Sequence, residues 1–324
     1  MNSEHVDTLI LVDSKNLVYR AHWVHRFLLS RGRCTSVLFG ALKMLAAVAK
    51  RMPNSAFVFV WDGSGGTWRH EMTNGSYKGH RQGPPNEDMA PAFPQIPILR
   101  AALHDAGFRE FECACLEADD LIGILGNIAL SKGLFKRVVI YSTDKDFYQL
   151  VTKRFGVMRG YDKDVPEHVM FEDEVGEEIG VHPTDWVKVK ALTGDPTDNI
   201  PKIATGLGPK TAIKMIQAGL DPSLLDFKKH QWEIRRNFQT FAGMWGKVRT
   251  NYKLSEIVCS VDDERLPEKV RVHLVDLVAD LTRESFLRDR RRISDESFTT
   301  FAEWLAEYEL NELFGMRHEL WRLP

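Results

Sequence analysis

Nine carboxylates stand at the ends of short apolar runs in this chain. The segments that carry them read LILVD, FVFVWD, CLEADD, STDKD and TGDPTD. The acidic residues are Asp13, Asp62, Glu117, Asp119, Asp120, Asp144, Asp146, Asp195 and Asp198. Like charges in one place repel and raise one another's pKa, so a core-forming sequence gains nothing from this pattern. Divalent cations remove the conflict, and oxygen ligands are those that Mg²⁺ or Mn²⁺ selects. The pattern therefore predicts a two-metal phosphodiester hydrolase.

Such a reaction needs an activated water and relief of the charge on the leaving oxygen. Two divalent ions roughly 4 Å apart can stabilise both the attacking and the leaving oxygen of an in-line displacement. Asp119 and Asp120 fall in the first turn of a predicted helix, where negative charge is favoured. Asp144 and Asp146 are two residues apart, so both face one way in an extended segment. Any one of these acids could equally be an N-cap or turn residue. The metal-site interpretation depends on all of them together.

The segment SYKGHR carries a second kind of chemistry. Lys78 and Arg81 lie three residues apart and would share a helix face. A lysine is a compact charge for a scissile phosphate, and an arginine is a forked donor for the same anion. Tyr77 beside them could stack on an unpaired base. The alternative is a polar loop that happens to carry charges.

GLGPKTAIKMI, residues 206–216, is a phosphate-binding pattern. Gly206 and Gly208 permit a tight turn, proline suits the first helical position, and a helix N-terminus presents free N–H groups. Lys210 adds a charge, Thr211 a hydroxyl, and Lys214 follows in the same segment. With the predicted helix 186–192 this forms a helix–hairpin–helix that grips a DNA backbone without reading its sequence. The spacing is not that of a Walker loop, and a plain Gly-Pro helix start is the alternative.

The elements that must position these residues alternate between strand and helix. Buried strands are predicted at 8–13, 56–62, 108–115 and 137–142, with helices at 37–51, 96–106 and 118–129. This alternation indicates a mostly parallel α/β sheet, in which ligands bind beyond the carboxyl ends of the strands. Farther along, helices are predicted at 173–179, 186–192, 209–218, 231–252 and 298–314.

The predicted organisation is therefore an α/β domain over 1–172 and a helical DNA-binding region over 173–324, with the helix–hairpin–helix at 186–218. Residues 68–97 break the pattern, being polar, basic and rich in Gly and Pro. A segment of that length without regular structure is functional or disordered in most domains. We predict a mobile element that grips the substrate and is disordered without DNA.

Bulk properties exclude several classes. Hydrophobic content of 44% and charged content of 27% are typical of a globular protein. The chain has no run of ~18 apolar residues, so no membrane span is predicted, and its N-terminus lacks a signal-peptide pattern. The scattered cysteines, with Cys113 and Cys115 expected on one strand, indicate thiols in a reducing compartment rather than a metal cage. A net charge of −2 does not itself indicate nucleic acid, although clustering the acids in one site would leave the remaining surface basic.

Taken together, the segments resemble the 5′-nuclease (flap endonuclease) family, with most similarity to the 5′–3′ exonuclease domain of bacterial DNA polymerase I and free-standing bacteriophage 5′ nucleases. The resemblance rests on LILVDSKNLVYRA, FVFVWDG, WRHEMTNGSYKGHR, CLEADDLIG, VVIYSTDKDFYQLV and VKVKALTGDPTDNIPKIATGLGPKTAIKMI. These motifs occur in the family's order and cover nearly the whole chain. Residues 221–246 match the family poorly.

The resemblance implies roles for the quoted residues. A first metal would be held by Asp13, Asp62, Glu117, Asp119 and Asp120, and a second by Asp144, Asp146, Asp195 and Asp198. Lys78 and Arg81 would contact the scissile phosphate at the base of a helical arch. Residues 206–211 would hold duplex DNA, in this family often with a K⁺ ion.

The expected activity is that of a 5′–3′ exonuclease and flap endonuclease on branched or 5′-ended DNA, in replication, repair or RNA-primer removal. We expect a cytoplasmic monomer without membrane contact, and with a separate polymerase or single-strand-binding protein as a potential partner. One alternative is a PIN-type ribonuclease, which shares acids on an α/β sheet. The other is a non-catalytic DNA-structure-binding protein, which lost carboxylates would favour.

Overall fold

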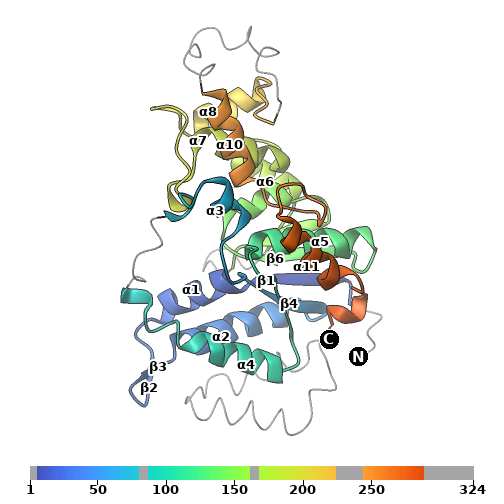
Figure 1. Cartoon of the computed structure of the whole chain (residues 1–324). Helices are drawn as coiled ribbons and strands as arrows, with labels where there is room; N and C mark the ends of the chain where they lie inside the picture. The colour runs from blue at the N-terminus through green and yellow to red at the C-terminus, as the bar shows by residue number, and fades with distance from the viewer. Residues whose placement is uncertain (1–5, 80–86, 161–167, 224–243, 288–324) are drawn as a thin grey trace.

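A six-stranded sheet with the strand order β5-β4-β1-β6-β7-β8 forms the centre of the molecule. The computed structural model describes residues 6–79, 87–160, 168–223 and 244–287 (Figure 1). All neighbouring strands pair in parallel except β7 and β8, which pair antiparallel at one edge. The strands are β1 (Thr8–Asp13), β4 (Ser55–Trp61), β5 (Arg109–Glu112), β6 (Arg137–Tyr141), β7 (Phe155–Met158) and β8 (Val169–Met170). A separate hairpin consists of β2 (Leu29–Ser30) and β3 (Arg33–Cys34).

Helices cover both faces of this sheet because its strands are apolar on both sides. Ile10 and Val12 of β1 face a core that they share with α1 (Ser14–His25), α2 (Ser36–Arg51) and α4 (Gln95–Asp105). Leu9 and Leu11 face the opposite core, which includes α5 (Ala118–Ser131) and α11 (Glu268–Val278). Figure 1 shows α1, α2 and α4 together on one side of the strands and α5 and α11 on the other.

The second half of the described chain is mainly helical. Its helices are α6 (Glu172–Ile179), α7 (Trp186–Thr193), α8 (Pro209–Gln217) and α10 (Trp245–Ser255), with short 3₁₀ turns at η5 (Pro183–Asp185) and η8 (Arg283–Ser285). Val175, Leu192 and Ile216 belong to the same buried cluster as the α5 face of the sheet. The core is thus continuous across the predicted boundary at residue 172, and the division into two domains stays a prediction. Within the described ranges, no helix combines the length and apolarity needed to span a bilayer.

The predicted fold class is confirmed, and several details differ. The helix α1, the strand β7 and the antiparallel edge strand β8 were not predicted. The third predicted strand ends at Glu112, so Cys113 and Cys115 do not share a strand, and Cys115 has a φ of 63°. The predicted helix 231–252 is described only from residue 244, where α10 (Trp245–Ser255) begins one residue later, and the predicted helix 298–314 lies outside the described residues.

The expectation of an unstructured element at 68–97 is wrong for the part that the structure describes. This part contains α3 (Trp68–Met72), the 3₁₀ turn η3 (Glu87–Met89) and the start of α4. Trp68 and Met89 are buried in the cores on the two faces of the sheet, and the Tyr77 side chain is buried with Ile200 and Leu254 of the helical half. Residues 80–86, which include Arg81, lie outside the described residues.

Two helical glycines give a test of how α5 packs. A Cβ at Gly123 of α5 would lie 2.6 Å from the carbonyl oxygen of Val258, whereas one at Gly246 of α10 would meet open space. Alanine in place of a helical glycine ordinarily stabilises by about 0.5–1 kcal/mol. We expect that gain for Gly246→Ala, and a loss of about 1–3 kcal/mol for Gly123→Ala because the backbone must shift. Urea unfolding of both variants measures the difference, and equal shifts would contradict the close approach of residues 257–259 to α5.

Candidate metal centre

Three of the predicted acids lie at one edge of the sheet because their strands are neighbours. Asp13 ends β1, Asp62 follows β4, and Asp144 follows β6, and β1 pairs in parallel with the other two strands. Asp13 accepts hydrogen bonds from Ser142 Oγ at 2.9 Å and from the backbone N–H of Asn16 at 3.1 Å. Asp62 accepts from the backbone N–H of Ala118 at 3.0 Å, which brings the start of α5 to the same edge.

The start of α5 adds Glu117 and Asp119. Glu117 precedes the helix as its N-cap, and Asp119 lies in the first turn, where the helix dipole favours negative charge. Burial, together with the charge of the adjacent Asp120, raises the pKa of Asp119 well above its ordinary value. Burial also raises the pKa of Asp13, and the charge of Asp62 acts in the same direction. These carboxyls therefore repel one another as the sequence pattern predicted.

A second group consists of Asp146, Asp195 and Asp198. In the described part of the chain these form a triad in which one carboxylate oxygen from each residue lies within 4.8 Å of those from the other two. Asp146 belongs to the 3₁₀ turn η4 (Lys145–Leu150), and Asp198 to η6 (Pro196–Asp198). A pair of 2.8 Å backbone hydrogen bonds between Asp195 and Ile200 closes the turn that brings Asp195 and Asp198 together. Burial, reinforced by the charges of Asp144 and Asp195, raises the pKa of Asp146 to about 6.

Lys190, which the sequence pattern did not predict as a site residue, neutralises part of this second group. Its side chain is 9% exposed, and its Nζ contacts Asp146 and lies 2.8 Å from Asp195 Oδ2. Burial alone would raise the pKa of Asp195, but the charge of Lys190 and hydrogen bonds from Lys190 and Thr197 lower it to about 2. The local sequence did not single it out, because Lys188 in the same predicted helix lies between two valines and yet pairs with acids nearer the surface.

Tyr77 and Lys78 connect the two groups of carboxylates. The Tyr77 hydroxyl lies 3.1 Å from Glu117 Oε2 and 3.1 Å from Asp198 Oδ2. Lys78 Nζ contacts Glu117 Oε1, lies 3.9 Å from Asp198 Oδ1, and the Lys78 backbone N–H donates to the Asp198 carbonyl at 3.0 Å. The prediction that Tyr77 stacks on a base is wrong for this structure, because the side chain is 3% exposed and its ring packs inside the protein.

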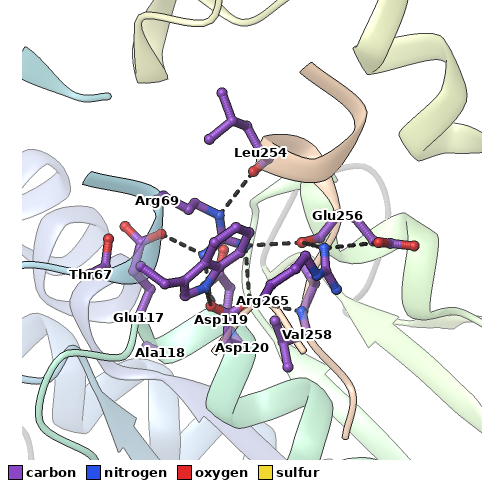
Figure 2. A network of polar contacts seen from close by, with 12 residues as sticks. Thr67, Arg69, Glu117, Ala118, Asp119, Asp120, Leu254, Glu256, Val258 and Arg265 are labelled. Atoms are coloured by element: carbon purple, nitrogen blue, oxygen red, sulfur yellow. Dashed lines mark hydrogen bonds and ion pairs between the residues drawn. The ribbon is translucent and has the colours of Figure 1, made fainter. Parts of the chain in front are cut away.

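Two further cations, which the sequence motifs did not predict, contact the first group. Lys15 Nζ lies 2.6 Å from Asp62 Oδ2 in an exposed pair. Arg69 of α3 is buried and contacts both Glu117 and Asp120 (Figure 2). Asp120 itself has no exposed surface, unlike the partly exposed Asp119 beside it.

The donor set fits hard divalent cations. Throughout the described residues the predicted ligands are carboxylates, and they outnumber the cations in contact with them: Lys15, Arg69, Lys78 and Lys190. Oxygen ligands with an excess of negative charge are what Mg²⁺ and Mn²⁺ prefer. The geometry brings together Asp13, Asp62, Glu117, Asp119, Asp144, Asp146, Asp195 and Asp198, and their assignment as metal ligands stays a prediction.

The predicted hairpin follows the triad in the chain. Gly206 has a φ of 80°, Gly208 is the N-cap of α8, and the helix begins at Pro209 as predicted. Lys210, Thr211 and Lys214 are exposed. The exposed side chains at the start of α8 therefore present two charges and a hydroxyl to solvent, and their contact with DNA stays a prediction.

Comparison with known proteins agrees with this geometry. Residues 8–180 match the sequence model of a family described as the 5′–3′ exonuclease, N-terminal resolvase-like domain. A 5′–3′ exonuclease of Aquifex aeolicus is 31% identical over 273 residues, which cover 83% of this chain and 88% of that protein. DNA polymerase I of Deinococcus radiodurans is 36% identical over 212 residues, covering 65% of this chain and 21% of the polymerase. The chain thus spans about a fifth of that relative's length.

Solved structures show the same fold. The T5 5′-exonuclease with bound zinc superposes with a TM-score of 0.59 at 18% identity, covering 93% of this chain and 99% of the other. Human GEN1 in complex with Holliday junction DNA superposes with a TM-score of 0.56 at 17% identity, covering 97% of this chain and 72% of the other.

Lys190→Met tests the balance of charge at the triad. Removing one partner of a buried ion pair costs about 3–5 kcal/mol, and partial exposure of the two aspartates reduces this to about 1–3 kcal/mol. We expect this loss of unfolding free energy in EDTA and its recovery in Mn²⁺, because a cation bound there replaces the lost charge.

The matched control is Lys188→Met. Lys188 pairs with Asp185 and Asp221 on a more exposed surface, so its loss should cost under about 1 kcal/mol and show no recovery with Mn²⁺. Urea unfolding with and without metal measures all four values. A deficit for Lys190→Met that is the same in EDTA and Mn²⁺ would contradict a cation site at the triad.

Proposed function

Because this chain belongs to the 5′–3′ exonuclease family, we propose that it is a metal-dependent, structure-specific 5′ nuclease that hydrolyses phosphodiester bonds in branched or 5′-ended DNA. The observation that carries the proposal is the collection of carboxylates at the carboxyl edge of the sheet, together with the triad of Asp146, Asp195 and Asp198. Replication, repair and RNA-primer removal are the processes in which such an activity is used.

Two divalent ions, Mg²⁺ or Mn²⁺, are the proposed cofactors. Asp146, Asp195 and Asp198, with Asp144, would hold one ion, and Asp13, Asp62, Glu117 and Asp119 would hold the other. When bound, such ions lower the pKa of a coordinated water and neutralise the leaving oxygen. The carboxylate-only donor set supports hard cations of this kind over zinc-type cages.

The protein's own cations have a second role in this proposal. Lys78 and Lys190 each contact a proposed ligand, so each competes with a metal cation for the same carboxylate. A Lys78 ammonium that leaves Glu117 stays within reach of the site and can hold the non-bridging oxygens of a phosphate. Arg81 is proposed as its partner there, and lies outside the described residues.

DNA binding is proposed for the hairpin and α8. Gly206, Gly208, Lys210, Thr211 and Lys214 would contact the duplex backbone, with a K⁺ ion as a further proposed component of the hairpin. The exposed, basic start of α8 supports this, since helix N-termini and lysines hold phosphates without reading sequence. A monomeric state, a cytoplasmic location and a separate polymerase or single-strand-binding protein as partner are further proposals that rest on the resemblance alone.

Cleavage of a 5′-end-labelled flap substrate, with product lengths resolved, tests the proposed activity. We expect cleavage in Mg²⁺ and none in excess EDTA. Asp146→Asn should abolish turnover and leave DNA affinity similar or higher, because it removes negative charge near phosphates. Preferred cleavage of a matched RNA would favour a ribonuclease, and DNA binding without any cleavage would favour a binding protein. Undiminished cleavage in EDTA would exclude a metal-dependent mechanism.

Lys210→Ala tests the hairpin separately from catalysis. Losing one phosphate contact should weaken duplex binding and reduce the slope of log affinity against log salt by about 1. Lys50→Ala is the control, because Lys50 is exposed near the end of α2, opposite the edge where α1 begins. Fluorescence anisotropy between 50 and 200 mM salt, roughly the range over which such contacts are resolved, gives both slopes. An unchanged slope for Lys210→Ala would refute the hairpin assignment.

A further inference from the structure

The guanidinium of Arg69 is fully engaged inside the protein. Its side chain is 2% exposed. Nη1 donates to Glu117 Oε2 at 2.9 Å and to Asp120 Oδ2 at 2.7 Å, and Nη2 donates to Asp120 Oδ1 at 2.9 Å and to the Glu256 carbonyl at 3.1 Å. Nε donates to the Leu254 carbonyl at 2.9 Å. Figure 2 shows this arginine between the start of α5 and the segment that follows α10.

Asp120 is engaged to the same degree. Its Oδ1 accepts from Arg69 Nη2 and from the backbone N–H of Val258 at 2.8 Å. Its Oδ2 accepts from Arg69 Nη1 and from Trp68 Nε1 at 3.0 Å. An ionised carboxylate offers about four lone-pair positions in total, and four donors already occupy those of Asp120. A metal ion would have to displace a buried donor to reach either oxygen.

We propose that Arg69 and Asp120 form a positioning pair, outside the metal-ligand set, that fixes Glu117 and joins the metal site to residues 254–258. This rests on the proposed function only in that Glu117 is taken as a metal ligand. The assignment of Asp120 as a ligand, which the sequence suggested, is replaced by this role.

The pair restricts Glu117 through one oxygen. Oε2 of Glu117 takes hydrogen bonds from Arg69 and from the Tyr77 hydroxyl, which leaves Oε1 directed toward Lys78. A planar guanidinium can hold two carboxylates and two carbonyls at fixed angles, whereas a lysine ammonium is a point charge with three rotating donors. Asp120 keeps the buried arginine neutralised and oriented, so its effect on Glu117 is indirect.

The pair also reaches the DNA-binding helices. Asn251 of α10 donates to the carbonyl of Ala191 in α7 at 3.1 Å and to that of Pro201 at 2.8 Å. Three residues later the same helix supplies the Leu254 carbonyl to Arg69. A continuous set of hydrogen bonds therefore runs from the start of the hairpin region through α10 and Arg69 to Glu117. Arg69 thus lies between the hairpin region and Glu117 in one set of hydrogen bonds.

Stability in EDTA separates a positioning residue from a ligand. Asp120→Asn places an amide NH₂ against donors and leaves Arg69 uncompensated, so its Tm should fall by several degrees without metal. Asp119→Asn, the adjacent control, removes a repelled charge, so its Tm in EDTA should be equal or higher.

In Mn²⁺ titration calorimetry, Asp120→Asn should keep the wild-type number of bound ions, and Asp119→Asn should lose one or bind it at least tenfold more weakly. If Asp120→Asn is as stable as wild type in EDTA and loses an ion, Asp120 is a ligand and the proposal is overturned.

A second variant keeps the test valid if Asp120→Asn does not fold. Arg69→Gln combined with Asp120→Asn removes both buried charges, so the double variant should recover a large part of the stability that either single variant loses. Losses that simply add would overturn the pairing.

Arg69→Lys gives a readout that a purely structural contact would not change. Single-turnover cleavage should fall by ~10²-fold, the apparent Mn²⁺ affinity should fall by ~10–100-fold, as for residues that orient ligands, and the Kd for flap DNA should stay within about twofold. Saturating Mn²⁺ should restore part of the rate. Wild-type rates and metal affinity in Arg69→Lys would overturn the positioning role.

Failure of the wild-type protein itself to bind Mn²⁺ or cleave would instead refute the proposed function, and the EDTA stability comparison would still decide the pairing.

Discussion

The structure depends on holding mutually repelling carboxylates at one edge of a sheet. Two like charges 4 Å apart interact by about 4 kcal/mol at the effective dielectric of a protein surface, and a domain is stable by only about 5–15 kcal/mol. A site with this many acids would unfold the protein if nothing compensated them. The compensation comes from backbone N–H groups at the start of α5 and η4, and from Arg69, Lys78 and Lys190. These three cations come from outside the sheet, so α3, the turn after it and α7 are held against the sheet by the same charges that make the site.

Much of this arrangement follows from the sequence because it is local. An acid at the end of a buried strand, such as Asp13, is placed by the strand itself, and parallel neighbours bring such ends together. The start of α5 and the start of α8 were also predictable, since N-caps and Gly-Pro turns are defined by a few adjacent residues. The strand β7 escaped prediction because FGVM is short and carries a glycine, which packs closely against Val169 and Phe171. The helix α1 begins inside the acidic motif, with Asp13 as its N-cap, and its mixed composition gives only a weak amphipathic pattern.

The roles of Arg69 and Lys190 could not be predicted, because most of their contacts are with residues distant in sequence. Arg69 finds its partners 48 to 187 residues away, and Lys190 meets Asp146 44 residues away. Nothing in the local sequence distinguishes these cations from Lys188 or Lys210, which face solvent or surface acids. For Tyr77, by contrast, the local sequence predicted a role in base stacking that the structure contradicts. An aromatic residue in a basic, polar segment suggests base stacking, but burial against Glu117 and Asp198 gives this hydroxyl a role inside the protein.

The Tyr77 hydroxyl makes the two groups of carboxylates interdependent. Burial, reinforced by the charge of Glu117, raises the pKa of Tyr77 above its ordinary value, so the phenol stays protonated at neutral pH. A phenol carries a single proton, yet its oxygen lies 3.1 Å from an oxygen of Glu117 and 3.1 Å from one of Asp198. It can donate to only one of them at a time, and the other contact must be compensated by a neighbouring cation. Lys78 is in position to do so for either carboxylate. Tyr77 and Lys78 thus link the two groups of carboxylates, so a shift of Glu117 or Asp198 alters the hydrogen bonding of the other.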